Sequence, residues 1–128
     1  MCQVNSVWTR KEKIRGYRIY KIVPDNIEVS YYDRNLRPKL GKVIEATEDP
    51  FHVFIGIPSL KKWAAYQVYY PDEEGNCNLV NFRIYLAELS GKIFTGVWGD
   101  IETVKTATGT RCTLIKDITK EMLPRIGL

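Results

Sequence analysis

The stretch from Glu48 to Tyr70 limits the fold of this chain more than any other, because it predicts a buried strand followed at once by a helix. Residues 51–55, FHVFI, are aromatic and β-branched with apolar side chains on both faces, which is typical of a central strand. Apolar residues then recur at helical spacing over about 59–70, and Ser59 is placed to cap that helix. We therefore expect one main helix packed on a sheet.

Strand chemistry dominates the rest of the chain, where runs of Ile, Val, Tyr and Phe alternate with turn residues. Pro24-Asp25-Asn26 predicts a hairpin turn, and Ser90-Gly91 predicts another. Consecutive strands joined by short turns favour antiparallel pairing. We expect an α+β protein with a mostly antiparallel, twisted sheet of six or seven strands. The predicted strands span 13–23, 27–32, 42–46, 51–55, 79–89, 93–99 and 111–118.

A chain of 128 residues is expected to form a single domain, 1–128. Residues 1–12 show no period and predict an N-terminal leader that lies across the body, with Trp8 either packed or exposed. The acidic residues 71–78 predict a loop tip, and 119–128 predict a helical turn and tail. Within 79–89, alternation predicts even positions on a buried face and odd positions on a wetter one.

Composition favours a cytoplasmic protein that does not enter a membrane. No apolar run is long enough to span a bilayer, and no signal peptide is evident. Cys2, Cys77 and Cys112 are widely spaced and form no C-x-x-C pair, which indicates reduced thiols rather than a disulfide framework. With only one histidine, the chain also lacks the ligand pattern of a structural zinc site. We expect no metal and no cofactor.

The positive charge is concentrated near the start of the chain. Residues 1–42 hold ten Lys and Arg against four Asp and Glu, whereas residues 43–128 hold nine against eleven. A basic first third predicts an anionic partner, which is a nucleotide, a nucleic acid or an acidic protein face. The alternative interpretation is a solvated charged face with no partner.

Basic residues and tyrosines interleave over 10–21, RKEKIRGYRIYK. Such a strand can bind nucleotides, because cations meet phosphate while rings stack on bases. We take Arg15, Tyr17, Arg18 and Tyr20 as candidate ligand-binding residues. The alternative is a basic edge strand whose charges protect it from aggregation.

His52 and Trp98 complete the candidate set. Histidine titrates near neutrality and serves as acid, base or ligand, but the neighbours of His52 are expected to be buried, so it is a candidate only if it is open to solvent. Trp98 lies between Gly96 and Gly99 and is expected to be exposed. No catalytic group is predicted, since Ser90-Gly91-Lys92 is a turn rather than a phosphate-cradling loop and no carboxylate pair is singled out.

Several short motifs resemble a loose group of small uncharacterised proteins of phages and gut-type bacteria. At Pro50 the chain departs from the group, which has glycine there. The resemblance implies the architecture and a mobile-genome setting, and it brings no activity with it. The matching residues are Met1-Cys2, Tyr20-Lys21, Leu40-Gly41-Lys42, Phe51-His52-Val53-Phe54, Gly91 and Asp117-Ile118.

Arg15-Gly16 also resembles the first NAD-contacting motif of the ADP-ribosyltransferase fold. The Ser-Thr-Ser stretch and the Glu-x-Glu loop of one branch of that family are absent from the sequence. The resemblance therefore implies a degenerate, non-catalytic member.

Together these patterns favour a non-enzymatic binding protein, for which the resemblance implies a phage-encoded, counter-defence setting. It would sequester an anionic, nucleotide-like ligand or inhibit a host defence protein. The alternatives are an ADP-ribosyltransferase-like, NAD-dependent enzyme and a nucleic-acid-binding protein. A homo-oligomer is a further option, because a small sheet protein often builds its pocket between subunits.

Overall fold

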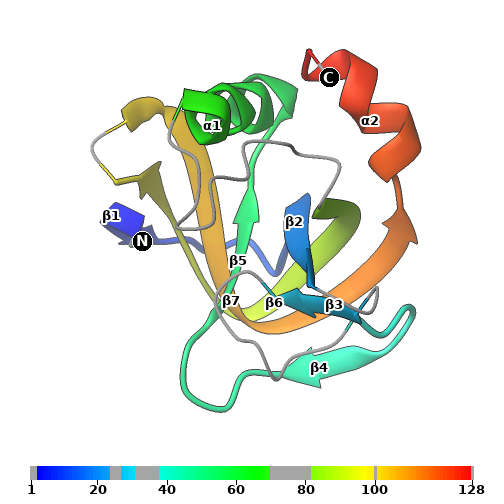
Figure 1. Ribbon diagram of the computed structural model, residues 1–128. Coiled ribbons are helices and arrows are strands. Elements are labelled where there is room, and N and C mark those ends of the chain that lie inside the picture. Colours follow the sequence, from blue (N-terminus) through cyan, green and yellow to red (C-terminus); the bar gives the residue numbers. More distant parts are fainter. Residues whose placement is uncertain (1–2, 24–26, 31–37, 70–81, 100, 128) are drawn as a thin grey trace.

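A computed structural model of the chain describes residues 3–23, 27–30, 38–69, 82–99 and 101–127 (Figure 1). The strands belong to one sheet and pair antiparallel, and two helices accompany it, which confirms the predicted α+β class. The elements are β1 (Gln3–Trp8), β2 (Lys13–Val23), β3 (Ile27–Ser30), β4 (Val43–Glu45), β5 (Phe51–Phe54), α1 (Ile57–Tyr69), β6 (Phe82–Trp98), β7 (Ile101–Asp117) and α2 (Thr119–Arg125).

The sheet closes on itself. β6 pairs with β2, β2 pairs with β5 at Tyr17 and Phe54, β5 pairs with β7, and β7 pairs back with β6. The closure depends on the length of β6 and β7, which have 17 residues each and bend around the molecule (Figure 1). Each of them therefore meets different partners along its two halves: β6 pairs with β2 over 82–90 and with β1 over 94–98.

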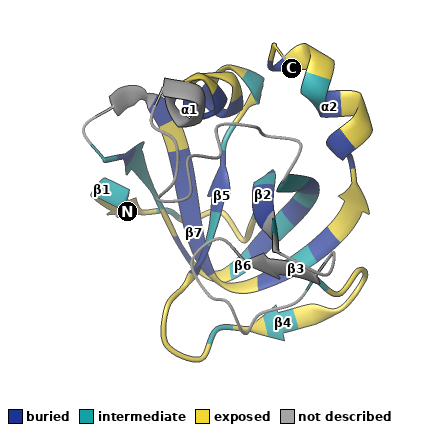
Figure 2. Cartoon of the chain, in the orientation of Figure 1, coloured by how far each residue is buried: buried dark blue, intermediate teal, exposed yellow. Residues whose placement is uncertain are grey.

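Closure gives the sheet an inner and an outer face, and a separate apolar core lies on each. The outer core is covered by α1 and α2, which lie together above the sheet (Figure 1). Figure 2 shows the buried residues concentrated on the central strands, whereas the segment that joins β4 to β5 is exposed. The outer core consists of Ile19, Phe54, Leu60, Trp63, Ala64, Ile84, Trp98, Val104, Ile118, Met122 and Ile126. The inner core consists of Tyr20, Phe51, Val53, Tyr85, Ala87, Leu89, Ile93, Ala107, Cys112 and Leu114.

The predicted strand and helix at 48–70 are confirmed as β5 and α1. The buried residues Leu60, Trp63 and Ala64 recur at helical spacing, as the sequence predicts. The role predicted for Ser59 is wrong, because α1 begins at Ile57. The Ser59 hydroxyl instead accepts a hydrogen bond of 2.9 Å from the Lys105 amide, which ties the helix to β7.

The predicted turn at Ser90-Gly91 is also wrong, because β6 continues through it. Gly91 has φ +81° and lies where the pairing register with β7 shifts, so the glycine forms a bulge that bends one long strand. The strand predicted at 111–118 is likewise part of a longer one, because β7 also includes the threonines that precede it. The expected wetter face of 79–89 is wrong as well: Tyr85 and Ala87 are buried, since the closed sheet has a core on its inside.

The predicted leader contains a strand. Residues 3–8 form β1, which pairs with the second half of β6. The predicted hairpin is confirmed by the pairing of β2 with β3, and the short strand predicted at 42–46 is confirmed as β4. The turn predicted at 24–26 and the loop tip predicted at 71–78 lie outside the described residues.

Candidate functional site

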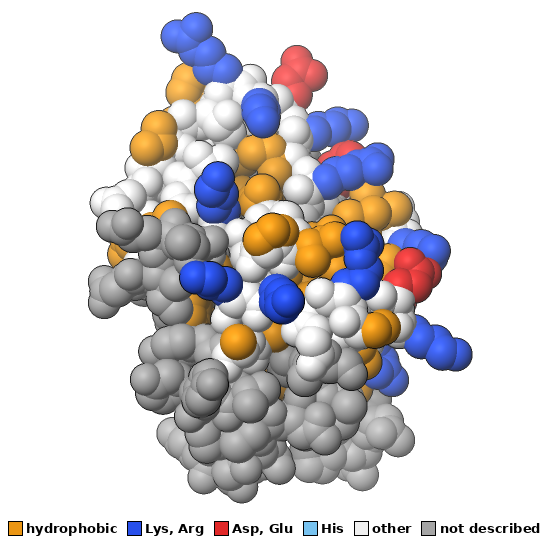
Figure 3. All heavy atoms as spheres, turned by 90° about the horizontal axis from the view of Figure 1, so that it is seen from above, with side chains coloured by type: hydrophobic (Ala, Val, Ile, Leu, Met, Phe, Trp, Pro, Cys, Tyr) orange, Lys and Arg blue, Asp and Glu red, His pale blue; other side chains and the backbone are white. Residues whose placement is uncertain are grey.

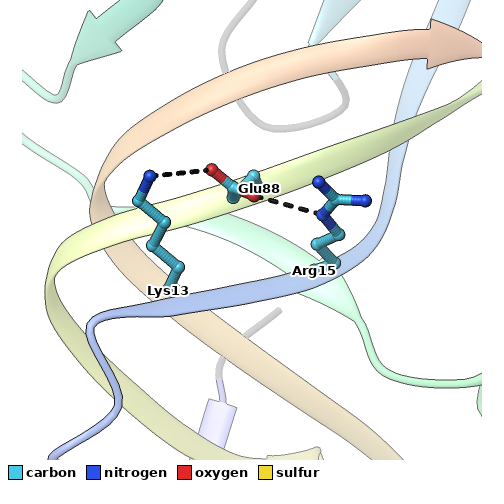
Figure 4. Close-up of polar contacts among 3 residues, drawn as sticks. All are labelled: Lys13, Arg15 and Glu88. Atoms are coloured by element: carbon cyan, nitrogen blue, oxygen red, sulfur yellow. Dashed lines mark hydrogen bonds and ion pairs between the residues drawn. The ribbon is translucent and has the colours of Figure 1, made fainter.

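Lys13 and Arg15 stand on the outer face of β2 and share one carboxylate. Arg15 lies directly opposite Glu88 of β6. Glu88 Oε2 is 3.1 Å from Arg15 Nε, and Glu88 Oε1 is 3.6 Å from Lys13 Nζ (Figure 4). In the described part of the chain the terminal nitrogens of Arg15 contact no acceptor. Glu88 therefore orients a guanidinium whose two terminal NH2 groups can still bind an anion.

Two exposed aromatic side chains stand next to each other where β1 meets β6. Trp8 pairs with Phe94, and directly opposed residues of an antiparallel pair project from the same face of the sheet. Ile93 belongs to the inner core, so Phe94 and Trp8 project from the outer face. Trp8 is 57% exposed and Phe94 36% exposed. Such an aromatic pair offers a surface on which a flat ligand can stack.

The segment that joins β1 to β2 connects the two features. The Thr9 amide donates a 3.0 Å hydrogen bond to the Ile93 carbonyl, which holds this segment against β6. Its residues Arg10 and Lys11 are exposed, and so is Lys92 of β6. We call the whole surface the basic-aromatic strip. It consists of Trp8, Arg10, Lys11, Lys13, Arg15, Lys92 and Phe94.

Charge in the strip is positive overall. Its five Lys and Arg face two carboxylates, Glu12 within the connecting segment and Glu88 of β6. The face that carries the helices, seen in Figure 3, also shows more Lys and Arg than Asp and Glu. That face therefore attracts anions in general, while the strip adds aromatic contact and a guanidinium oriented by Glu88.

His52 lies in the same cross-strand row as the aromatic pair. Phe94 pairs with Thr108 of β7, and Thr108 pairs with His52 of β5. The imidazole is partly buried and meets the Phe54 ring edge-on, with 5.5 Å between ring centroids. Burial, and then the positive charge of Arg18, lower the pKa of His52 from 6.5 to about 4. His52 is therefore neutral at neutral pH and adds no positive charge to the strip.

A polar network beside this row was missed from the sequence. Gln3 Nε2 donates to Thr106 Oγ1 over 3.1 Å, and Thr108 Oγ1 donates to Gln3 Oε1 over 3.3 Å. Gly96 makes room for it, because a Cβ there would lie 2.8 Å from Gln3 Cγ. The one sequence signal was the glycine, which admits close approach of another strand. The network fixes β1, and with it Trp8, against β6 and β7.

Arg18 and Tyr20 lie away from the strip, in the inner core. Successive residues of a strand point to opposite faces, so Arg18 and Tyr20 point inward while Arg15 and Tyr17 point outward. Arg18 Nε donates to the Tyr20 hydroxyl over 3.1 Å, and Arg18 Nη1 donates to the His52 carbonyl over 3.1 Å. The guanidinium carbon also lies 5.0 Å from the centroid of the Phe51 ring. The contacts show how the inner core accommodates a buried cation.

Tyr17 and Trp98 belong to the outer core. Tyr17 is partly buried and packs against that core. The predicted exposure of Trp98 is wrong: it is 8% exposed, because the strand carries it under the helices. Of the six candidate residues only Arg15 lies in the strip. The exposed tryptophan is Trp8, for which the sequence left both outcomes open.

The chain matches no protein-family model, no curated protein and no solved structure. Among the described residues, no three His, Cys, Asp or Glu side chains are grouped to hold a metal ion. No helix in this part of the chain is long and apolar enough to cross a membrane.

Proposed function

We propose that the chain binds an anionic, nucleotide-like ligand on the basic-aromatic strip. The observation that carries the proposal is the exposed pair Trp8–Phe94 on the same outer face as the guanidinium of Arg15. A base would stack on the aromatic pair, and its phosphates would bind the neighbouring cations. The strip offers both kinds of contact that a nucleotide requires.

The spacing along β6 supports this arrangement. Trp8 pairs with Phe94, whereas Lys13 pairs with Ser90 and Arg15 with Glu88, so the two cations meet β6 four and six positions from the aromatic pair. A strand rises about 3.3 Å per residue, so along β6 the aromatic pair lies at most about 13 Å from Lys13 and at most about 20 Å from Arg15, and the bulge between Ser90 and Ile93 shortens both separations. The long side chain of Lys13 can shorten the nearer separation, whereas Glu88 holds the guanidinium of Arg15 in place.

Glu88 holds the guanidinium of Arg15 in place before a ligand binds, and it does so through a weak ion pair. The Lys13 and Arg15 side chains are 65% and 63% exposed and that of Glu88 is 22% exposed, and ion pairs at the surface contribute about 0–1 kcal/mol each. An incoming phosphate can therefore compete with Glu88 for Arg15, and breaking the ion pair costs little free energy. Until it arrives, Glu88 limits the conformations of the guanidinium, which reduces the entropy lost on binding.

The role that we propose is sequestration rather than catalysis. A histidine with a pKa of about 4 is a weak base, so His52 is poorly suited to remove a proton at neutral pH. In the phage setting implied by the resemblance, a sequestered nucleotide would be a signal of host defence. Inhibition of a host protein through the same strip is the second form of the proposal, since an acidic protein face presents similar charge.

Calorimetric titration with ATP, NAD and a short oligothymidylate tests the proposal. Arg15→Gln should weaken binding by about 10- to 100-fold, because hydrogen bonds to charged groups are worth about 1.5–3 kcal/mol. Trp8→Ala should weaken it by a similar factor, since stacking on one base is worth about 1–3 kcal/mol. Lys120→Gln on α2 is the matched control, because it removes one exposed cation from another element.

Two results would contradict the proposal. One is the absence of binding by all three probes at low salt. The other is an equal, small loss in Arg15→Gln and Lys120→Gln, which would indicate a diffuse charge effect rather than a site. Preference for the oligothymidylate, with affinity that falls steeply between about 50 and 200 mM salt, would assign the strip to nucleic acid instead.

A further inference from the structure

A second exposed apolar cluster lies at the β4 edge of the sheet, apart from the basic-aromatic strip. Leu40, Val43 and Ile115 are 56%, 62% and 39% exposed. Val43 pairs with Thr113 of β7, and Leu40 bridges to Leu114, so all three side chains surround the same short stretch of β7. Single exposed apolar residues are ordinary, whereas a group of them marks an interaction surface.

β4 also offers backbone hydrogen-bonding groups. It is an end strand of the sheet, and in the described part of the chain only β7 pairs with it. The Ala46 amide donates to the Thr110 carbonyl over 2.9 Å. Alternate residues of an antiparallel strand face the same neighbour, so the backbones of Val43 and Glu45 face away from β7. An added strand can therefore bond to Val43 and Glu45 while its side chains reach the apolar cluster.

The charge around the cluster indicates what such a strand would contain. Lys39 and Lys42 are exposed and form no ion pair within the described residues. Arg111 pairs with Glu45 over 3.2 Å, and Lys116 pairs with Glu121 over 3.1 Å. Among the described residues beside the cluster, Lys39 and Lys42 therefore remain without an ion-pair partner, whereas the charges of Arg111 and Lys116 are balanced by Glu45 and Glu121. The excess positive charge disfavours a second copy of this chain, which carries the same charge, and attracts an acidic partner.

We propose that the β4 edge binds an extended, acidic segment of another protein by strand addition. Apolar side chains of that segment would pack on Leu40, Val43 and Ile115, and its carboxylates would bind Lys39 and Lys42. β4 has only three residues, so we expect a small and transient interface. This surface is formed by other strands than the strip, and it does not depend on the nucleotide-like ligand.

A labelled peptide in which Glu alternates with Val is the probe, and fluorescence anisotropy is the measurement. Binding should weaken with salt, and Val43→Glu should weaken it by about tenfold or more. The double reversal Lys39→Glu with Lys42→Glu should abolish binding of this peptide and create binding of the matched Lys-Val peptide. Methylation of alternate peptide amides should remove binding if the partner adds as a strand. Thermal unfolding of each variant checks its folding, which is expected to be unchanged because the replaced side chains are exposed.

Arg15→Gln separates the two proposals, because it should leave peptide binding unchanged whatever happens to nucleotide binding. Equal binding of the Glu-Val and Lys-Val peptides would overturn the inference. So would no binding at all, or binding that survives amide methylation. Sedimentation provides a further test: a dimer that dissociates in Val43→Glu would show that the edge pairs with a second copy instead.

Discussion

Replacing His52 with Gln should make the protein less sensitive to acid. The imidazole of His52 is partly buried on β5. The guanidinium of Arg18 lies nearby and donates a hydrogen bond to the backbone carbonyl of His52. Burial and this positive charge lower the pKa of His52 from 6.5 to about 4. At about 1.4 kcal/mol per pKa unit, the difference corresponds to about 3 kcal/mol between the two protonation states.

The direction in which pH changes the unfolding free energy follows from where the folded and unfolded states take up a proton. The unfolded chain binds a proton at His52 as the pH falls through 6.5, whereas the folded chain does so only near pH 4. Between these values the unfolded state holds more protons, so the free energy of unfolding falls as the pH falls. The His52 contribution to stability is complete above pH 6.5 and is lost by about pH 4.

Urea unfolding of the wild type and of His52→Gln across this pH range measures the effect. The difference in unfolding free energy between the two proteins should shift by about 3 kcal/mol in favour of the variant as the pH is lowered. Because the chain has a single histidine, the NMR titration of its imidazole gives the native pKa without ambiguity. Parallel stability curves for the two proteins, or a native His52 pKa close to 6.5, would contradict this prediction.

Two further substitutions test the packing and the polar contacts. Gly16→Ala should destabilise the protein by about 1–3 kcal/mol in chemical unfolding, because the new Cβ would lie 2.6 Å from Val53 Cγ2 and 2.7 Å from the Phe54 carbonyl. An unchanged unfolding midpoint would show that β2 and β5 can move apart. Thr119→Val should cost about 1–3 kcal/mol, since the buried Ile84 amide loses the hydroxyl that accepts its 2.8 Å hydrogen bond. Thr119→Ser keeps that hydroxyl and should retain most of the stability.

Local patterns predicted the individual elements well. The bounds 13–23 are confirmed for β2, and its mixed faces indicated that each side would be partly covered. The strand and helix at 51–69 were also predictable, because aromatic and β-branched runs and a helical stripe are local signals. The continuity of β6 was not predictable in this way, since Ser90-Gly91 suits a turn and a bulge equally. Closure depends on pairings between distant strands, which no local pattern specifies.

The candidate site was only partly predictable for the same reason. The charge of residues 10–15 was evident, and alternation along β2 could have separated Arg15 from Arg18. The pairing of Trp8 with Phe94 could not be foreseen, because it depends on a register across 86 positions of sequence, from 8 to 94. Trp98 was misplaced because its flanking glycines indicate close backbone approach as readily as exposure, and only the position of the helices decides between them.

The closed sheet has a consequence for how the protein is made. β1 finds its partner only when residues 94–98 have left the ribosome, and β5, which meets β2 at a single residue pair, gains its longer pairing only with residues 106–109. At about 5–20 residues per second, roughly 5–20 s pass between the synthesis of Gln3 and that of Trp98. During this interval the first strands present unpaired edges and uncovered apolar side chains. The nascent chain should therefore be most vulnerable to aggregation and proteolysis just before β6 and β7 emerge.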